Sequence, residues 1–219
     1  MPTLRLAHRG DWRRAPENSL AAFLAALETP GCDGLELDVR ISRDGVAVCY
    51  HDDTLTRLHG IDRRVAETTV AELEELGVPS LADVLAAVPR RAFLDVELKG
   101  ETGRPAFEAL VAGRGPGLER AIVSSFEPAA LQRVAGWAPT WPRWLNALDA
   151  EARTIDQAVE LGCIGVAINW RALDRRTVRV ARGAGLQVGA FTVRRRATYR
   201  RLERLGLTLI CAEASALDG

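Results

Sequence analysis

Apolar and polar side chains alternate with a period of two in several short segments, and longer segments between them have helical spacing. In residues 34–39, three apolar side chains alternate with Glu36 and Asp38. This alternation is typical of a strand, in which successive side chains point to opposite faces. Glu36 and Asp38 therefore share one face, and residues 93–99 repeat the pattern.

The remaining strands and helices follow one another along the chain. We expect strands at residues 4–7, 46–50, 121–124, 143–147, 164–168, 187–193 and 208–211. A first helix is expected after Asn18 or Ser19, either of which can cap it. Its apolar face would consist of Leu20, Phe23, Leu24 and Leu27. Short helical segments are expected at 70–76 and 81–88, and later helices beginning near Arg104, Pro128, Ala152, Leu173 and Ala197.

Regular alternation of strand and helix predicts a parallel sheet covered by helices. About eight strands favour a compact TIM-type (β/α)8 barrel, an α/β fold that forms a single domain over residues 1–219. Only about a dozen residues separate Asp38 from His51, too few for a crossover helix. We expect an extended return with a tight turn at Asp44-Gly45, and then a short insertion over the site at residues 52–91. An open doubly wound sheet is the alternative, but a glycine-rich dinucleotide turn is absent after the first strand.

Composition narrows the class of protein. Hydrophobic residues make up 47% of the chain and charged residues 26%, which is ordinary for a soluble globular protein. A net charge of +0 favours neither nucleic acid nor an anionic membrane as partner, so phosphate recognition has to be local. No stretch has the length of a transmembrane segment. The four cysteines are scattered without a close pair, which indicates reduced thiols and a cytoplasmic location.

Lys99 is the only lysine among 29 Lys and Arg residues. A compact ammonium in a tight site cannot be exchanged for a broad guanidinium, whereas a surface lysine can. We therefore expect Lys99 to be required by the chemistry of the site.

Polar residues interrupt the apolar strands at their carboxyl ends. These residues are His8 and Arg9, Glu36 and Asp38, His51 and Asp52, and Glu97 and Lys99. In a β/α barrel the carboxyl ends of the strands form one rim, where enzymes of this fold place their sites. Four separate segments are therefore expected to meet at one point.

The chemistry of this set is coherent. Glu36, Asp38 and Glu97 offer oxygen ligands for one divalent cation, Mg²⁺ or Ca²⁺. Two histidines can carry protons near neutral pH, and Arg9 and Lys99 can bind an anion. Together they predict metal-assisted hydrolysis of a phosphate diester.

Two further titratable residues lie near these motifs in the sequence. Asp95 lies on the same face as Glu97 and is expected to support it from behind. His59 lies in a polar stretch and is expected at the surface, outside the site.

The motifs, taken in order, resemble those of the glycerophosphodiester phosphodiesterase family. The resemblance rests on His8-Arg9-Gly10, Pro16-Glu17-Asn18-Ser19, Glu36-Leu37-Asp38-Val39, Ser42-Arg43-Asp44-Gly45, His51-Asp52, Glu97-Leu98-Lys99, Ser124-Ser125-Phe126 and Phe191-Thr192-Val193. It implies a β/α barrel that hydrolyses a glycerophosphodiester to sn-glycerol 3-phosphate and an alcohol.

The resemblance also implies roles for individual residues. It implies that Glu36, Asp38 and Glu97 bind the metal and that Arg9 and Lys99 contact the phosphate. It implies acid/base catalysis by His8 and His51. The attacking group would be either water or a hydroxyl of the glycerol. Glu17 and Phe191 are expected in the substrate pocket.

The sequence departs from the family pattern late in the chain. Phe191 stands where many members have Trp, and Ala212-Glu213 stands where a Thr-Asp pair is common. These departures leave other functions open: a related phosphodiesterase acting on lysophospholipids, or a catalytically silent barrel that binds a phosphorylated metabolite. A metal-dependent isomerase on the same fold is disfavoured, because it would not explain the presence of Arg9 and Lys99 in the site.

Overall fold

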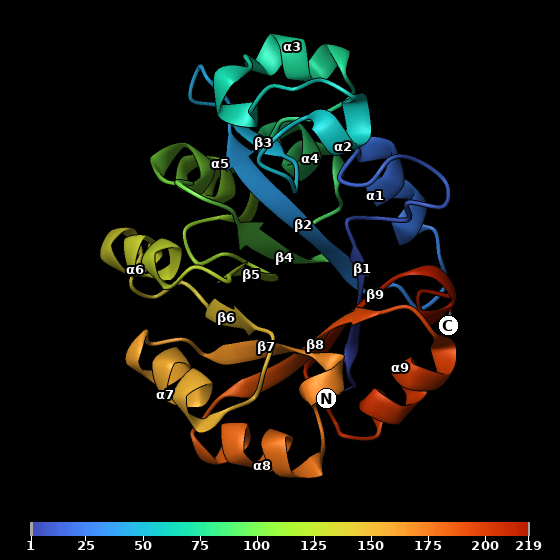
Figure 1. Ribbon diagram of the computed structural model, residues 1–219, viewed down its shortest axis with the longest axis vertical. Helices are drawn as coiled ribbons and strands as arrows, with labels where there is room; N and C mark the ends of the chain where they lie inside the picture. Colours follow the sequence, from blue (N-terminus) through green and yellow to red (C-terminus); the bar gives the residue numbers. More distant parts are fainter. Residues whose placement is uncertain (1, 219) are drawn as a thin grey trace.

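The computed structural model describes residues 2–218, which form a closed barrel of parallel strands surrounded by helices (Figure 1). Neighbouring strands follow the order β1, β9, β8, β7, β6, β5, β4, β2, and pairing of β1 with β2 closes the ring. The predicted TIM-type barrel is therefore confirmed. The parallel strands are β1 (Leu4–His8), β2 (Gly34–Ile41), β4 (Phe93–Leu98), β5 (Ala121–Ser125), β6 (Arg143–Ala147), β7 (Gly165–Asn169), β8 (Gln187–Val193) and β9 (Leu209–Ala212).

Strand β3 (Ala47–Cys49) lies outside the ring and runs antiparallel to the end of β2. The return between them is tight, because Gly45 adopts a φ of 82° and its N–H donates to the Ser42 carbonyl oxygen at 3.0 Å. This is the short extended return that the spacing predicted, and it places His51 beside the carboxyl end of β2.

The helices begin close to the expected residues. They are α1 (Leu20–Leu27), α2 (Thr56–His59), α3 (Val70–Glu75), α4 (Leu81–Ala87), α5 (Arg104–Arg114), α6 (Pro128–Trp137), α7 (Ala152–Glu160), α8 (Arg175–Gly183) and α9 (Arg196–Glu203). Among residues 2–218, none of these helices combines the length and the apolar character needed to cross a bilayer.

Helix α1 shows one local error of the sequence interpretation. Ser19 caps it by accepting a hydrogen bond from the Ala22 N–H, but Leu24, expected on the buried face, is 39% exposed. The buried side consists of Phe23 and three alanines instead. The helix packs tightly against the turn that follows β1. A Cβ on Gly10, in this turn, would lie 2.6 Å from the Ala22 carbonyl carbon.

Residues 52–91 contain α2, α3 and α4, and α3 lies at one end of the molecule beyond β3 (Figure 1). This segment has a small apolar cluster of its own with β3 and Tyr50. The members of the cluster are Val48, Tyr50, Leu55, Val65, Leu73 and Val78. The cluster packs this segment against β3.

The barrel interior is filled below the site by an apolar cluster around Trp144. Trp144 is 1% exposed, and β7 and β8 make room for its ring with glycines. A Cβ on Gly165 would lie 2.3 Å from the Trp144 ring, and one on Gly189 would lie 2.9 Å from it. The indole therefore fills the barrel interior below the site, and the hollow lies above it at the carboxyl ends of the strands.

Candidate active site

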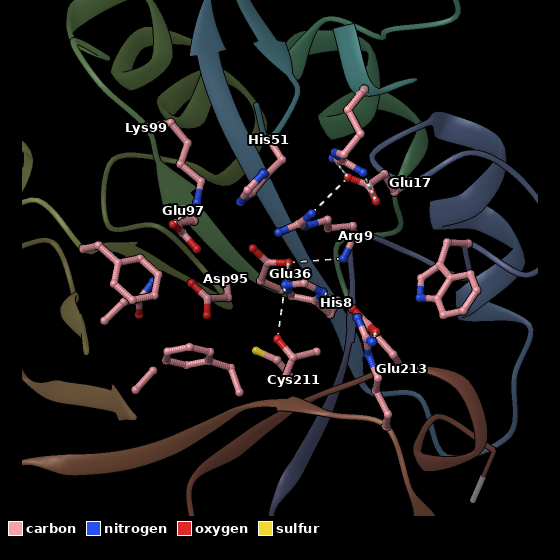
Figure 2. A pocket seen from close by; sticks show the side chains of 18 residues that line it. His8, Arg9, Glu17, Glu36, His51, Asp95, Glu97, Lys99, Cys211 and Glu213 are labelled. Carbon is pink, nitrogen blue, oxygen red and sulfur yellow. Dashed lines mark hydrogen bonds and ion pairs between the residues drawn. The ribbon is translucent and has the colours of Figure 1, made fainter. Parts of the chain in front are cut away.

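A hollow of about 530 Å³ opens at the carboxyl ends of the strands (Figure 2). The residues predicted from the sequence line it together, with the exception of Asp38, which lies beneath the surface and is 0% exposed. The predicted lining residues are His8, Arg9, Glu17, Glu36, His51, Glu97, Lys99 and Phe191.

Three buried carboxylates meet at the centre. Glu36 and Asp38 lie on β2, and the parallel register of β2 with β4 sets Glu97 beside Asp38. One oxygen from each carboxylate lies within 4.8 Å of the others. Glu36 Oε1 is buried and has no hydrogen-bond partner among the described residues.

The pKa values reflect this crowding. Burial, together with the Asp38 charge, raises the pKa of Glu36 well above its usual range. Burial and the same Asp38 charge raise the pKa of Glu97 to about 7. Clustered oxygen donors that are costly to ionise together fit a divalent cation such as Mg²⁺ or Ca²⁺. The residues present therefore suit the expected metal.

Asp38 is held ionised by two cations. Arg9 Nε lies 3.1 Å from Asp38 Oδ2, and Lys99 Nζ lies 3.1 Å from Oδ1. Although burial alone would raise the pKa of Asp38, the charges of Lys99 and Arg9 lower it to about 2. Asn18 fixes the same side chain, because its Nδ2 donates to Asp38 Oδ2 at 2.9 Å and its Oδ1 accepts from the Asp38 N–H at 3.2 Å.

The two cations are themselves anchored. Lys99 pairs with Glu97 as well as Asp38, and these charges raise its pKa although burial alone would lower it. Arg9 adopts a φ of 59°, and its Nη1 contacts Glu17 Oε1 at 2.9 Å. Both side chains line the hollow with their charge retained, so an anion entering it meets two fixed cations.

Each of the two histidines that line the hollow has a carboxylate partner at Nδ1. His8 Nδ1 lies 2.5 Å from Glu213 Oε1, and His51 Nδ1 lies 2.6 Å from Asp52 Oδ1. A carboxylate at Nδ1 fixes the ring orientation and leaves Nε2 as the nitrogen that exchanges a proton. His8 Nε2 lies 3.8 Å from Glu36 Oε2, and the two rings stand on different sides of the acidic cluster (Figure 2). Burial lowers the pKa of His51, although the Asp38 charge and the hydrogen bond to Asp52 act in the opposite direction.

Asp95 was expected behind Glu97, but it lines the hollow itself (Figure 2). It is buried and accepts a hydrogen bond from Ser124 Oγ at 2.6 Å. Burial raises the pKa of Asp95 to about 7. His59 does not line the hollow and stacks on Tyr50, with 5.9 Å between ring centroids.

Sequence reasoning missed three contacts of the site. Glu213 was noted only as a departure from the family pattern, yet it is the partner of His8. Asn18 was read as a possible helix cap, although its amide holds Asp38. Arg57, from α2, binds Glu17 Oε1 at 2.6 Å and Asp52 Oδ2 at 2.5 Å, so it ties two walls of the hollow together.

Comparisons with known proteins agree with this geometry. A family model described as "Glycerophosphoryl diester phosphodiesterase family" matches residues 8–215. A glycerophosphodiester phosphodiesterase of Caldanaerobacter subterraneus is 34% identical over 157 residues, and the match spans 64% of each chain. One from Bacillus subtilis is 26% identical, over 94% of this chain and 81% of its own length.

Solved structures give the same result for the fold. An Oleispira antarctica phosphodiesterase in complex with the product sn-glycerol 3-phosphate superposes with a TM-score of 0.86 at 28% identity, over 96% of this chain and 93% of its own. A Thermotoga maritima glycerophosphodiester phosphodiesterase superposes with a TM-score of 0.82 at 26% identity, over 100% and 96%. The family indicated by the sequence motifs is confirmed, and so is the expectation of an enzyme of this family.

Proposed function

Because this chain belongs to the glycerophosphoryl diester phosphodiesterase family, we propose that it hydrolyses glycerophosphodiesters to sn-glycerol 3-phosphate and an alcohol. The observation that carries the proposal is the meeting of three buried carboxylates, two carboxylate-paired histidines and two anchored cations in one hollow. The product named in the Oleispira antarctica complex supports the same reaction.

Glu36, Asp38 and Glu97 would hold one divalent cation, Mg²⁺ or Ca²⁺. When bound, such an ion supplies Lewis-acid polarisation of a phosphoryl oxygen. Burial and the Asp38 charge, which raise the pKa values of Glu36 and Glu97, make these carboxylates suited to ionise against such a cation.

Arg9 and Lys99 bind the phosphate of the substrate. Their charges face the hollow and are set in place by Asp38, Glu17 and Glu97 before substrate arrives. Preorganised cations stabilise the charge that develops on the phosphoryl oxygens without reorganisation during the reaction.

His8 and His51 transfer the protons. One Nε2 accepts the proton of the attacking hydroxyl, which forms the new P–O bond, and the other Nε2 donates a proton to the alkoxide as its P–O bond breaks. The attacking group is water, or a glycerol hydroxyl that gives a cyclic phosphate which water then opens. Glu17 and Phe191 form walls of the substrate pocket. Arg57, from the 52–91 segment, lines the pocket beside Glu17 and forms an ion pair with it.

Purified protein tests the proposal with glycerophosphocholine, glycerophosphoethanolamine and lysophosphatidylcholine, each with Mg²⁺ or Ca²⁺ and with excess chelator. We expect metal-dependent release of glycerol 3-phosphate from the two water-soluble diesters. Turnover of lysophosphatidylcholine alone would indicate a related phosphodiesterase that acts on lysophospholipids. Binding of glycerol 3-phosphate without turnover of any of the three would point to a silent barrel.

A further inference from the structure

A second hollow, of about 620 Å³, adjoins the first at the carboxyl ends of β7 and β8. Phe191, Thr192 and Arg194 line both hollows, so the two share a wall and open side by side. Phe191 packs edge-on against Phe126, with 5.4 Å between ring centroids. A substrate whose phosphate lies in the first hollow can therefore extend one of its two ester groups into the second.

The second hollow is strongly basic. Arg171, Arg194 and Arg195 line it, and no acidic side chain of the described residues does. Arg194 Nε engages Glu213 Oε2 at 2.7 Å, whereas Arg171 and Arg195 form no ion pair with any carboxylate between residues 2 and 218. Two guanidinium groups thus remain available for an anion.

An aromatic ring completes the wall. The guanidinium of Arg171 lies 4.6 Å from the centroid of the Trp170 ring, and that of Arg201 lies 5.7 Å from it. Stacking on an indole limits the freedom of an arginine side chain, so less ordering remains to be done when an anion binds. The hollow therefore combines a flat apolar surface with positioned cations.

The charge around this hollow corrects the expectation drawn from the net charge. Residues 171–204 contain 11 arginines and two acidic residues, a formal charge of +9, and the remainder of the chain carries −9. This segment includes α8 and α9, which lie at the opposite end of the molecule from α3 (Figure 1). A zero net charge hides a positive field on one side of the rim, and such a field steers anions.

We propose that the second hollow binds the alcohol part of the substrate and selects alcohols that carry a phosphate group of their own. The inference rests on the proposed function, because it requires the diester phosphate to lie between Arg9 and Lys99. The planar forks of Arg171 and Arg195 match the oxygens of a phosphate monoester, and Trp170 accommodates the carbon chain of a polyol. The substrate class is then the glycerophosphodiesters of phosphorylated polyols.

The test uses two substrates that differ by one phosphate: glycerophosphoglycerol and the same molecule with a terminal phosphate monoester. Release of glycerol 3-phosphate at low ionic strength gives kcat/KM for each. We expect the phosphorylated substrate to be preferred about tenfold, the size of effect that one or two exposed charge-assisted hydrogen bonds produce. The double variant Arg171→Gln/Arg195→Gln should reduce this preference to about twofold or less.

Arg176→Gln/Arg179→Gln is the matched control, because it removes the same charge from exposed positions of α8 that do not line the hollow. It should retain most of the preference. An equal loss in both double variants would overturn the assignment in favour of a diffuse field. Normal hydrolysis of glycerophosphoglycerol without any preference would overturn this inference alone, whereas no hydrolysis of either substrate would overturn the proposed function with it.

Discussion

The two halves of the barrel differ in what they bring to the site. The half from β1 to β4 contributes the acidic cluster, the histidines and the two anchored cations. The half from β5 to β9 contributes aromatic, amide and hydroxyl groups, two arginines that form no ion pair within residues 2–218, and Glu213 at its end. Strand register sets the carboxylates Asp38 and Glu97 side by side, whereas the groups that the second half contributes are spread over several strands and loops.

The halves meet where β4 pairs with β5 and where β1 pairs with β9, and side chains cross the second junction as well. Glu213 reaches His8, and Arg13 binds both Asp11 and Asp218. The chemistry of the first half therefore depends on contacts from the end of the second.

The largest effect is expected from the histidines themselves. His8→Ala and His51→Ala should each lower kcat for a glycerophosphodiester by about 10²- to 10⁴-fold, because each removes a proton carrier. His59→Ala is the control, since that ring lies outside the hollow, and its kcat should stay near that of the wild type. Wild-type rates in both His8→Ala and His51→Ala, measured by glycerol 3-phosphate release, would rule out the assigned proton transfers.

Glu213 tests whether the second half assists the first. Glu213→Gln should lower kcat by about 10- to 100-fold with little change in KM, because it loosens the ring of a proton carrier without touching the phosphate site. Glu213→Asp, which keeps the charge, should recover part of the loss. If Gln and Asp behave alike, or if only KM changes, Glu213 does not position His8.

Metal binding should stabilise the first half measurably. Mg²⁺ or Ca²⁺ at about 100 times its Kd should add about 2.7 kcal/mol to the free energy of unfolding. In a chain of this size the gain corresponds to a rise in Tm of roughly 5–10 °C. Glu97→Gln should remove most of the rise, whereas Glu119→Gln, on the exposed surface, should leave it intact. An equal metal-induced rise in the two variants would place the ion elsewhere.

The smallest effect concerns the Arg13 bridge across the junction. Hydrogen bonds from Arg13 lower the pKa values of Asp11 and Asp218. Carboxylates with lowered pKa values stabilise the fold above their ordinary pKa and lose that contribution as the pH falls through the lowered values. Arg13→Gln should therefore lower Tm at pH 7 by about 2–4 °C, for a loss of about 1 kcal/mol.

Thermal melts of wild type and Arg13→Gln between pH 7 and pH 3 check this. The two Tm curves should converge on acidification, because only the wild type loses the bridge. Arg90→Gln, which breaks the exposed pair with Glu119, serves as the control and should shift Tm much less. Parallel curves would show that the bridge contributes nothing across the junction.

The sequence predicted the fold and most of the first half because both follow from local rules. Segments with period-two alternation predicted the strands. A polar side chain at the carboxyl end of an apolar strand is expected at the rim of a barrel, because the carboxyl ends of all the strands meet there. Glu36, Asp38, Glu97, His8 and His51 accordingly meet in one hollow or directly beneath it.

The remainder depends on contacts that spacing does not encode. His8 and Glu213 are 205 residues apart, and they meet only because β9 closes against β1. Asn18 adopts a φ of 57° just before the Ser19 cap, which turns its amide toward Asp38. Leu24 fitted a helical stripe, but the alanines of α1 pack closer to the sheet than leucine would.

Closure of β9 on β1 also has a consequence for biosynthesis. While the chain emerges from the ribosome, all three carboxylates of the acidic cluster are synthesised long before Glu213 and Asp218, which complete the surroundings of His8 and Arg13. The surroundings of His8 are therefore incomplete until the last strand is synthesised and the ring of strands closes.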